Sequence, residues 1–226
     1  MTTVDVASNT NANAAKVTIT SSNIPSTLPN ANNPLTTVAG DIVVDDANHR
    51  LLVSDHGQKA ILAIDLTTGA RSILSGAGVP DNINLFGSPR GLTLDSGNNR
   101  VLVVSGTDST MYAVDLDTGV RTILSGDGVP DNVNSFSRPN GMAIDNIFGG
   151  VLVTDHPNSS VLVVEPTSGA RSVLTSATIP DSINPLSSPI GVAVSAATNQ
   201  IFILDIQLQA VFAVEPVTGQ RVVLSK

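Results

Sequence analysis

The sequence predicts an all-β protein made of repeated units, each containing four short antiparallel strands. The first observation is an internal period of 50 residues. The second is that short β-branched and apolar runs are separated by turns rich in Gly, Asn, Asp and Ser. The third is that no window shows an apolar period of 3.6 residues, so we expect hardly any helix. The residues that carry the period are Arg71, Arg121, Arg171 and Arg221; Gly69, Gly119, Gly169 and Gly219; Pro80, Pro130 and Pro180; and Pro89, Pro139 and Pro189.

The four strands of a unit can be placed one after another along residues 91–140. Leu92–Asp95 alternates between apolar and polar residues and is the first strand, which a turn at Asn98-Asn99 ends. Val101–Val104 is a β-branched apolar run and forms the second strand. The third and fourth strands are expected at Met111–Asp115 and Arg121–Ser125, with a tight connection between them.

Four antiparallel strands in a unit of 40–50 residues are typical of one blade of a β-propeller. Blades that stack around an axis bury both faces of their sheets, which explains why the second strand is apolar at nearly every position. A β-helix is a weaker interpretation, because its repeats are much shorter. Aromatic residues are only 3% of the chain and Trp is absent, so Val, Ile, Leu and Ala must fill the space between blades.

Two motifs resemble those of known propeller repeats. Pro89-Arg-Gly-Leu-Thr-Leu-Asp95 and Pro139-Asn-Gly-Met-Ala-Ile-Asp145 resemble the opening of NHL-type repeats. Leu51-Leu-Val-Ser-Asp55 and Val151-Leu-Val-Thr-Asp155 are similar to the second strand of NHL and YWTD-type blades. The resemblance extends from about Asp41 to the end of the chain. It implies a propeller related to the NHL, YWTD and SMP-30/gluconolactonase-like groups, which are commonly six-bladed.

The period divides the chain into four full blades and a leading half-blade. The full blades are expected at 41–90, 91–140, 141–190 and 191–226. Residues 1–40 align with the second half of a unit and are expected to supply only strands three and four. In this alignment Lys16–Thr20 matches Arg71–Ser75, Ile24-Pro25 matches Val79-Pro80, and Pro34 matches Pro89. The residues through which the half-blade would contact another molecule are Val4, Val6, Val17 and Ile19.

The extra half-blade leaves three explanations open. The chain could be a segment of a longer propeller. It could instead close as a four-bladed ring with its N-terminal segment packed outside. In the third explanation, another subunit fills the unpaired edge of the half-blade, which would give an oligomer or a filament by strand addition.

Composition excludes several classes of function. The net charge is −8 and no basic cluster is present, so we expect no nucleic-acid partner. The absence of cysteine excludes disulfides, Cys-ligated metals and thiol catalysis. We see no signal peptide and no apolar run of the length that spans a bilayer. The Ser-, Thr- and Asn-rich composition favours an extracellular or cell-surface location.

Two groups of residues are candidates for metal binding. The first lies at the ends of second strands, near the expected channel mouth, and consists of Asp55, His56, Asp155, His156 and Asp205. A metal there would need at least three converging ligands, with Ca²⁺ or another divalent ion as the candidates. The second group is the loop sequence Asp81-Asn-Ile-Asn84 and its repeats at 131–134 and 181–184. Such Asp/Asn loops bind Ca²⁺ in some proteins, but a turn capped by its own side chains is the favoured interpretation.

Opposite charges flank each tight hairpin between strands three and four. These charges could form a binding site for an anion. We favour instead a cross-strand ion pair on the outer edge of each blade, because the pattern of charges recurs in all four units. The pairs are Asp65/Arg71, Asp115/Arg121, Glu165/Arg171 and Glu215/Arg221.

Two function classes follow from this sequence. The favoured one is a non-enzymatic structural or protein-interaction propeller without a cofactor, which binds a protein partner or assembles with itself. Near-identical blades support it, since catalysis needs different residues converging on one pocket. The alternative is a metal-dependent enzyme of lactonase-like or lyase-like type, which predicts a bound divalent ion. Elemental analysis of the purified protein separates the two.

Overall fold

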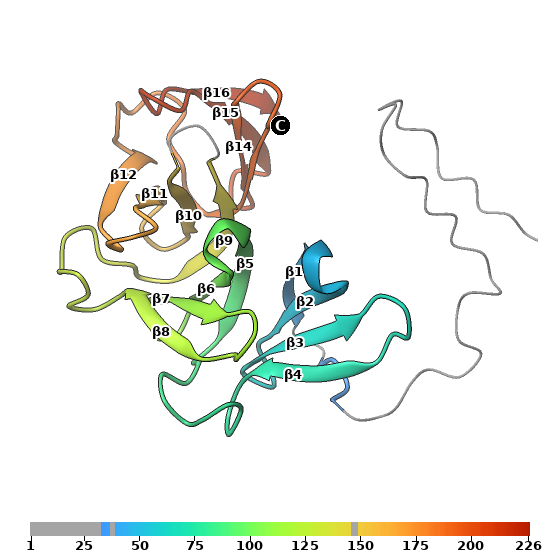
Figure 1. Cartoon of the computed structure of the whole chain (residues 1–226). Coiled ribbons are helices and arrows are strands. Elements are labelled where there is room, and N and C mark those ends of the chain that lie inside the picture. The colour runs from blue at the N-terminus through green and yellow to red at the C-terminus, as the bar shows by residue number, and fades with distance from the viewer. Residues whose placement is uncertain (1–32, 37–38, 146–148) are drawn as a thin grey trace, which may run out of the picture.

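The computed structural model describes residues 33–36, 39–145 and 149–226. These residues form four four-stranded antiparallel sheets, in which consecutive strands are hydrogen-bonded neighbours. The protein is therefore an all-β propeller, as predicted (Figure 1). The predicted half-blade at 1–40 falls almost entirely outside the described residues, as do Val4, Val6, Val17 and Ile19.

Each sheet is one blade, and its strands follow one another in the chain. Blade 1 comprises β1 (Ala39–Asp45), β2 (Arg50–Asp55), β3 (Ala60–Asp65) and β4 (Arg71–Ser75). Blade 2 comprises β5 (Pro89–Asp95), β6 (Arg100–Ser105), β7 (Thr110–Asp115) and β8 (Arg121–Ser125). Blade 3 comprises β9 (Pro139–Ile144), β10 (Val151–Asp155), β11 (Ser160–Val164) and β12 (Arg171–Ser176). Blade 4 comprises β13 (Pro189–Val194), β14 (Ile201–Asp205), β15 (Ala210–Val214) and β16 (Arg221–Ser225).

Helix is nearly absent from the described residues, in agreement with the apolar pattern. Two 3-10 turns, η1 (Asp46–Asn48) and η2 (Ser96–Asn98), connect the first two strands of blades 1 and 2. Each ends on a residue in the left-handed conformation, His49 and Asn99 respectively, which reverses the chain into strand two. No helix in this part of the chain is long and apolar enough to cross a membrane.

The first strand of each blade begins earlier than the predicted unit boundary. Pro89, Pro139 and Pro189 are the first residues of β5, β9 and β13, a position that tolerates the missing N–H of proline. In the sheet register Pro89 lies opposite Ser105, and Ala39 lies opposite Asp55 in the same way. Ala39 therefore occupies the place of Pro89, and the expected match of Pro34 with Pro89 is wrong.

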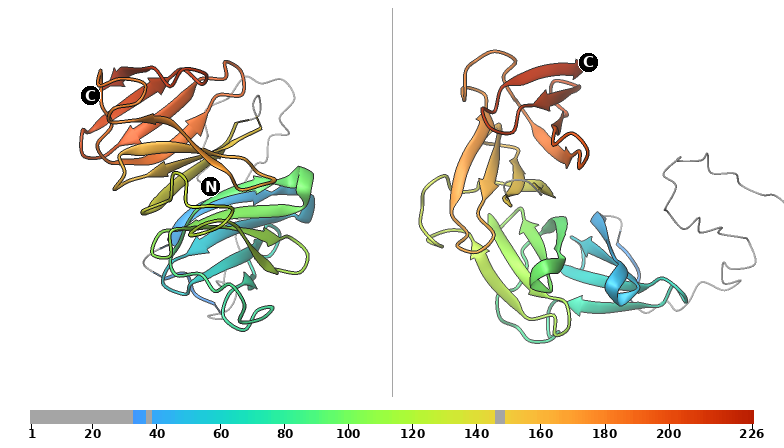
Figure 2. Two further views of the ribbon diagram at one scale, coloured as in Figure 1. Left: turned by 90° about the vertical axis from the view of Figure 1, so that its left-hand side faces the viewer. Right: turned by 45° about the horizontal axis from the view of Figure 1, so that its top comes forward.

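Three hydrophobic clusters join neighbouring blades. One lies between blades 1 and 2, one between blades 2 and 3, and one between blades 3 and 4. Leu102 and Val104 of blade 2, for example, pack with Val151 and Val153 of blade 3, and all four are at most 1% exposed. This aliphatic packing confirms the prediction that the space between blades is filled with few aromatic rings. The blades follow one another in an arc, from blade 1 at one end to blade 4 at the other (Figure 2).

The two end blades expose apolar side chains that are buried elsewhere in the array. Leu204 and Leu224 of blade 4 stand at the repeat positions of Val104 and Leu124, which are 0% and 9% exposed. In blade 4 these positions are 44% and 60% exposed. The far face of the last blade therefore has the composition of a blade-to-blade interface, but the described residues do not cover it.

Candidate interaction surface on the loops between blades

Three of the predicted site residues, Asp55, Asp155 and Asp205, are fully buried at the ends of strands β2, β10 and β14. Each carboxylate accepts hydrogen bonds from backbone N–H groups of the loop that enters its own blade, and so fixes that loop to strand two. The donors are Thr36 to Asp55 at 2.7 Å, Ser137 and Arg138 to Asp155 at 2.7 and 2.9 Å, and Ser187 and Ser188 to Asp205 at 2.7 and 2.9 Å.

The environment of Asp55 keeps its carboxylate ionised. Burial favours the neutral form, but hydrogen bonds from the hydroxyl and backbone N–H of Thr36 and from Gln58 outweigh this effect and lower the pKa of Asp55. The buried charge of Asp55 is thus balanced by hydrogen bonds from the two segments that it holds together, at Thr36 and Gln58. Its role in this structure is to anchor a loop.

The two predicted histidines lie on different blades. His156 in blade 3 makes a hydrogen bond between Nδ1 and the Ser188 hydroxyl at 2.9 Å, while His56 follows strand two of blade 1 and is half-buried. The structure does not bring the five predicted metal-site residues together. Within the described ranges, no group of three or more His, Asp or Glu side chains is arranged to hold a metal ion.

The long loops between blades contain turns capped by their own side chains. In the first loop, the Asp81 carboxylate accepts the N–H of Ile83 at 2.8 Å, and the Asn82 side chain accepts the N–H of Gly78 at 2.8 Å. Asp131 and Asp181 accept the corresponding N–H groups in the next two loops. The turn interpretation of the Asp/Asn sequences is therefore confirmed.

A buried arginine holds each of these loops. Arg121, the first residue of β8, reaches into the loop that follows blade 1 and donates from Nη1 to Ser75 Oγ at 2.7 Å and to the Val79 carbonyl at 2.9 Å. Its Nη2 donates to the Asp81 carbonyl at 2.9 Å, and its Nε to the Asn84 carbonyl at 3.0 Å. We call one such arginine with its surrounding loop an arginine joint. Arg171 and Arg221 form the same joint with the loops that follow blades 2 and 3.

The expected ion pairs across the hairpins are therefore wrong for these three blades. Asp115 ends strand β7 and accepts hydrogen bonds from Thr118 in its own turn, at 2.7 Å from both the N–H and the hydroxyl. Arg121 lies opposite Val114 in the sheet, one position away from Asp115. Because neighbouring strand positions point to opposite faces, the two charges cannot meet across the hairpin.

The arginine side chains of the joints are completely buried. The side chains of Arg121, Arg171 and Arg221 are 0% exposed. Burial lowers the pKa of Arg121 from its ordinary value, and the charge of Asp81 at 3.2 Å partly opposes this shift. The Arg121 guanidinium also lies over the Phe86 ring, 5.5 Å from its centre. A guanidinium in this setting must keep its hydrogen bonds, which gives the loops one defined conformation.

The most exposed apolar side chain of each joint lies at the same repeat position, while Val129 and Ile179 of the second and third loops are less exposed, at 37% and 44%. Ile83, Val133 and Ile183 occupy the same position in the three loops and are 64%, 59% and 66% exposed. Their backbones are held on both sides. The N–H of Ile83 donates to Asp81, and its carbonyl accepts from Arg121 Nε at 3.0 Å. Sequence reasoning missed these residues, although a lone branched apolar residue inside each Asp/Asn loop was the available signal.

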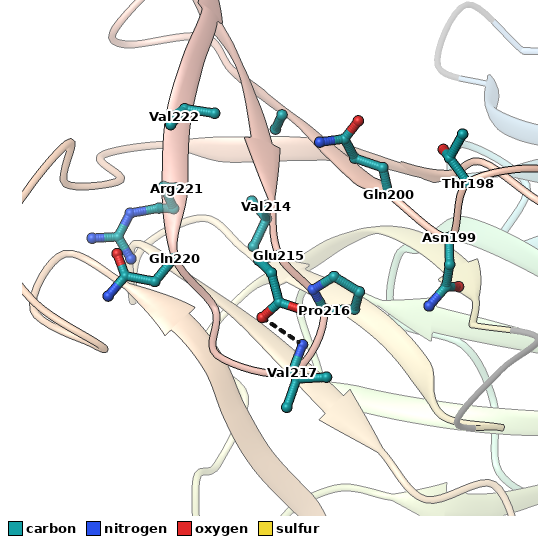
Figure 3. A pocket seen from close by; sticks show the side chains of 11 residues that line it. Thr198, Asn199, Gln200, Val214, Glu215, Pro216, Val217, Gln220, Arg221 and Val222 are labelled. Atoms are coloured by element: carbon teal, nitrogen blue, oxygen red, sulfur yellow. Dashed lines mark hydrogen bonds between the residues drawn. The ribbon is translucent and has the colours of Figure 1, made fainter.

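A separate hollow of about 610 Å³ lies on blade 4 (Figure 3). Its lining includes Gln200, Val214, Glu215, Val217 and Val222. The Glu215 carboxylate accepts the N–H of Val217 at 3.0 Å, and hydrogen bonds within this turn lower the pKa of Glu215. Of the two charged residues that line the hollow, Glu215 caps its own hairpin and Arg221 holds the loop that follows blade 3.

The fold is similar to several solved propellers. The protein in a nidogen/laminin complex matches with a TM-score of 0.65 and 17% identity, over 84% of this chain and 63% of that one. A gluconolactonase from Xanthomonas campestris matches with a TM-score of 0.64 and 15% identity, over 84% and 63%. A virginiamycin B lyase from Staphylococcus aureus matches with a TM-score of 0.62 and 14% identity, over 88% and 58%.

These matches have clear limits in sequence and in length. The chain spans 58–63% of the three solved proteins. No protein-family model matches the sequence, and no curated protein matches it either. At identities of 14–17%, the likeness shows that the chain shares the architecture of β-propellers whose named members include both enzymes and a protein found in a complex.

Proposed function

We propose that this chain is a non-enzymatic interaction module that binds a protein partner through the loops between its blades. The observation that carries the proposal is the exposed side chain of Ile83, Val133 and Ile183 at the same position of three successive loops. Exposed apolar residues on a rigid backbone are typical of binding surfaces, because little conformational entropy is lost when a partner covers them.

The surroundings of these side chains support the same function. The polar residues Asp81 and Asn82 precede Ile83 in the same loop and accept backbone N–H groups there, and an apolar residue with polar neighbours is typical of an interface. The proposal includes no resident metal or other cofactor. It places the protein outside the cell or at its surface, which its cysteine-free, Ser- and Thr-rich composition favours.

The proposal is tested with a triple variant, Ile83→Ser, Val133→Ser and Ile183→Ser. Purified proteins of the source organism and further copies of the chain itself are offered to the immobilised variant and to the immobilised parent chain. The matched control is Val217→Ser, which removes an equally exposed apolar side chain (71%) from the β15–β16 connection. We expect a partner that the parent and the control retain and the triple variant loses.

Two results would overturn the proposal. One is equal retention of every partner by the triple variant and the control. The other is a stoichiometric divalent ion, found by elemental analysis, together with hydrolysis of lactones or cleavage of cyclic esters that depends on that ion. The second result would establish the enzymatic alternative.

A further inference from the structure

Blade 1 and blade 4 each expose one half of the contact that joins neighbouring blades elsewhere. Ile42 of blade 1 is 54% exposed, whereas Leu92, at the same position of blade 2, is 2% exposed in the cluster between blades 1 and 2. Leu66 is 42% exposed, whereas its equivalent Leu116 in the same cluster is 4% exposed. Blade 1 thus exposes the side that would face a preceding blade. Blade 4 exposes the opposite side, with Leu224 at 60%. We call these sides the open faces of blades 1 and 4.

The contact between neighbouring blades contains a serine hydroxyl that both donates to the next blade and accepts from it. Ser75 of blade 1 donates to the Gly119 carbonyl of blade 2 at 2.7 Å and accepts from Arg121 Nη1 at 2.7 Å. Ser125 of blade 2 repeats both bonds with blade 3, at 2.7 and 2.6 Å. Both serines are 0% exposed. Two hydrogen bonds to one buried hydroxyl therefore fix how each blade sits on the one before it.

The open faces carry the three groups of this serine contact, divided between the two ends of the array. Blade 4 has the equivalent serine, Ser225, which ends β16 and is exposed. Blade 1 has the Gly69 carbonyl at the position of Gly119, and the Arg71 guanidinium at the position of Arg121. Arg71 is half-buried, and none of the described residues accepts a hydrogen bond from its side chain. A partly buried guanidinium is costly to leave without acceptors, and a serine hydroxyl supplies one.

A second polar contact between blades is divided in the same way. Arg50 of blade 1 donates from Nη2 to the Leu116 carbonyl of blade 2 at 2.6 Å, and Arg100 repeats this bond to blade 3 at 2.6 Å. Gln200 occupies this position in blade 4, where it lines the hollow of that blade (Figure 3). Its amide N–H group is a donor, and the equivalent acceptor on blade 1 is the carbonyl of Leu66.

We propose that the open face of blade 4 binds the open face of blade 1 of a second copy of this chain, in the arrangement that joins blades within one copy. The occupant is a second copy because the chain itself carries the complementary half of the contact. The contact also continues an interface that forms three times in each copy, between blades 1 and 2, 2 and 3, and 3 and 4. Ser225 of one copy then donates to the Gly69 carbonyl of the other and accepts from its Arg71.

This contact differs from the strand addition considered from the sequence, because it joins the faces of two sheets rather than their edges. It is also separate from the proposed function, since it uses the two ends of the array and not the loop tips between blades. Different patches meet on the two copies, so the contact is of the head-to-tail kind. Such contacts give a closed ring where the rotation between copies closes, and a filament where it does not.

Multi-angle light scattering of the purified full chain over a range of concentrations tests the contact. We expect the parent chain at about 100 μM to have the mass of two or more copies, and this mass to fall on dilution. Leu224→Asp and Ile42→Asp should each raise the dissociation constant about a hundredfold or more, because an unpaired carboxylate would be buried at the contact. The matched control is Leu85→Asp, since Leu85 is 45% exposed away from both open faces and its equivalent, Ser135, is already polar. Far-UV circular dichroism verifies that the variants keep their sheets.

Mixing the two blocked variants shows which faces meet. Leu224→Asp keeps an intact open face on blade 1, and Ile42→Asp keeps an intact open face on blade 4. Each variant alone should have the mass of one copy. The mixture should form complexes that contain one copy of each variant and grow no further, because the remaining two faces are blocked.

Three results would overturn the proposal. The first is a parent chain that keeps the mass of one copy up to about 1 mM, which would leave further blades or another protein to cover the open faces. The second is assembly of Ile42→Asp alone to the extent of the parent, because the face of blade 4 would then bind itself. The third is loss of assembly in the triple loop-tip variant, which would place the contact on the loops. Leu224→Asp keeps all three loop tips, so its retention of a loop-tip partner shows that the two proposals fail separately.

Discussion

Replacing Arg171 by Met tests the energetic weight of an arginine joint. The Arg171 side chain is 0% exposed and donates six hydrogen bonds, to Ser125, Gly126, Val129, Asp131, Val133 and Asn134. Met keeps most of the aliphatic volume and removes all of the donors. The substitution leaves buried carbonyls without partners, and breaking a buried charged network of this kind costs about 3–5 kcal/mol.

The simple sum of the hydrogen bonds would overestimate this loss. Six bonds to a charged group at about 1.5–3 kcal/mol each would total about 9–18 kcal/mol, as much as the whole stability of a typical domain, and such contributions do not add. Burial also lowers the pKa of Arg171, which shows that removal of the guanidinium from water opposes part of the gain. We therefore expect the lower value of about 3–5 kcal/mol.

Urea unfolding followed by far-UV circular dichroism measures the effect. With a slope of about 3 kcal/mol per molar urea, the midpoint should fall by about 1–1.7 M. Arg138→Met is the control, because Arg138 is exposed and its loss should change stability by less than about 0.5 kcal/mol. Equal midpoints for the two variants would refute the view that the joint couples blades 2 and 3.

Three further predictions concern a backbone contact and two titrating groups. Gly169→Ala should lower the melting temperature much more than Gly128→Ala. Both glycines have φ near 70°, but a Cβ on Gly169 would lie 1.8 Å from a carbonyl oxygen of the preceding blade, whereas a Cβ on Gly128 would have no neighbouring atom within 4 Å. Equal melting temperatures of the two variants would contradict this reasoning. Hydrogen bonds from Ser168 lower the pKa of Glu165 from 4.5 to about 2. The ionised Glu165 therefore stabilises the folded chain above pH 4.5, and this contribution is lost as the pH falls towards 2. Urea titrations at several pH values should show a weaker pH dependence of stability for Glu165→Gln than for the parent chain. Burial raises the pKa of Tyr112, the single Tyr in a chain without Trp, so ultraviolet titration should show no tyrosinate in the native protein at pH about 11, and a midpoint near 10 would be inconsistent with the buried ring.

Much of the fold could be predicted from the sequence because the repeat and the strand pattern carry the same information. Predicted strands such as Val101–Val104 and Arg121–Ser125 agree with β6 (Arg100–Ser105) and β8 (Arg121–Ser125) within one residue. The alternating pattern predicts strand one at Leu92–Asp95, whereas β5 begins three residues earlier, at Pro89. Proline breaks the interior of strands, but it is compatible with the first position, and the pattern alone does not distinguish these cases.

The joints could not be predicted, because periodicity shows which residues are equivalent and not what they contact. Arg121 and Asp115 flank one hairpin in the sequence, and the local interpretation paired them. The actual acceptors, such as the carbonyl of Val79, lie 42 residues away in the sequence. They are backbone carbonyls, which every residue has, so no residue type marks them in the sequence. Asp155 is a similar case, because the sequence offered it as a metal ligand while its partners in the structure are backbone N–H groups of its own entry loop.

The reliance of the joints on main-chain carbonyls has a consequence for diversification. Since Arg171 contacts the carbonyls of Val129, Val133 and Asn134, most side chains of that loop can change while the grip on its backbone is kept. Randomising the tip positions occupied by Val133 and its equivalents should therefore alter what the surface recognises, one blade at a time, without loosening the array. The architecture separates the residues that hold the blades together from the exposed residues that we propose bind a partner, which is the property a scaffold needs for selecting new binders.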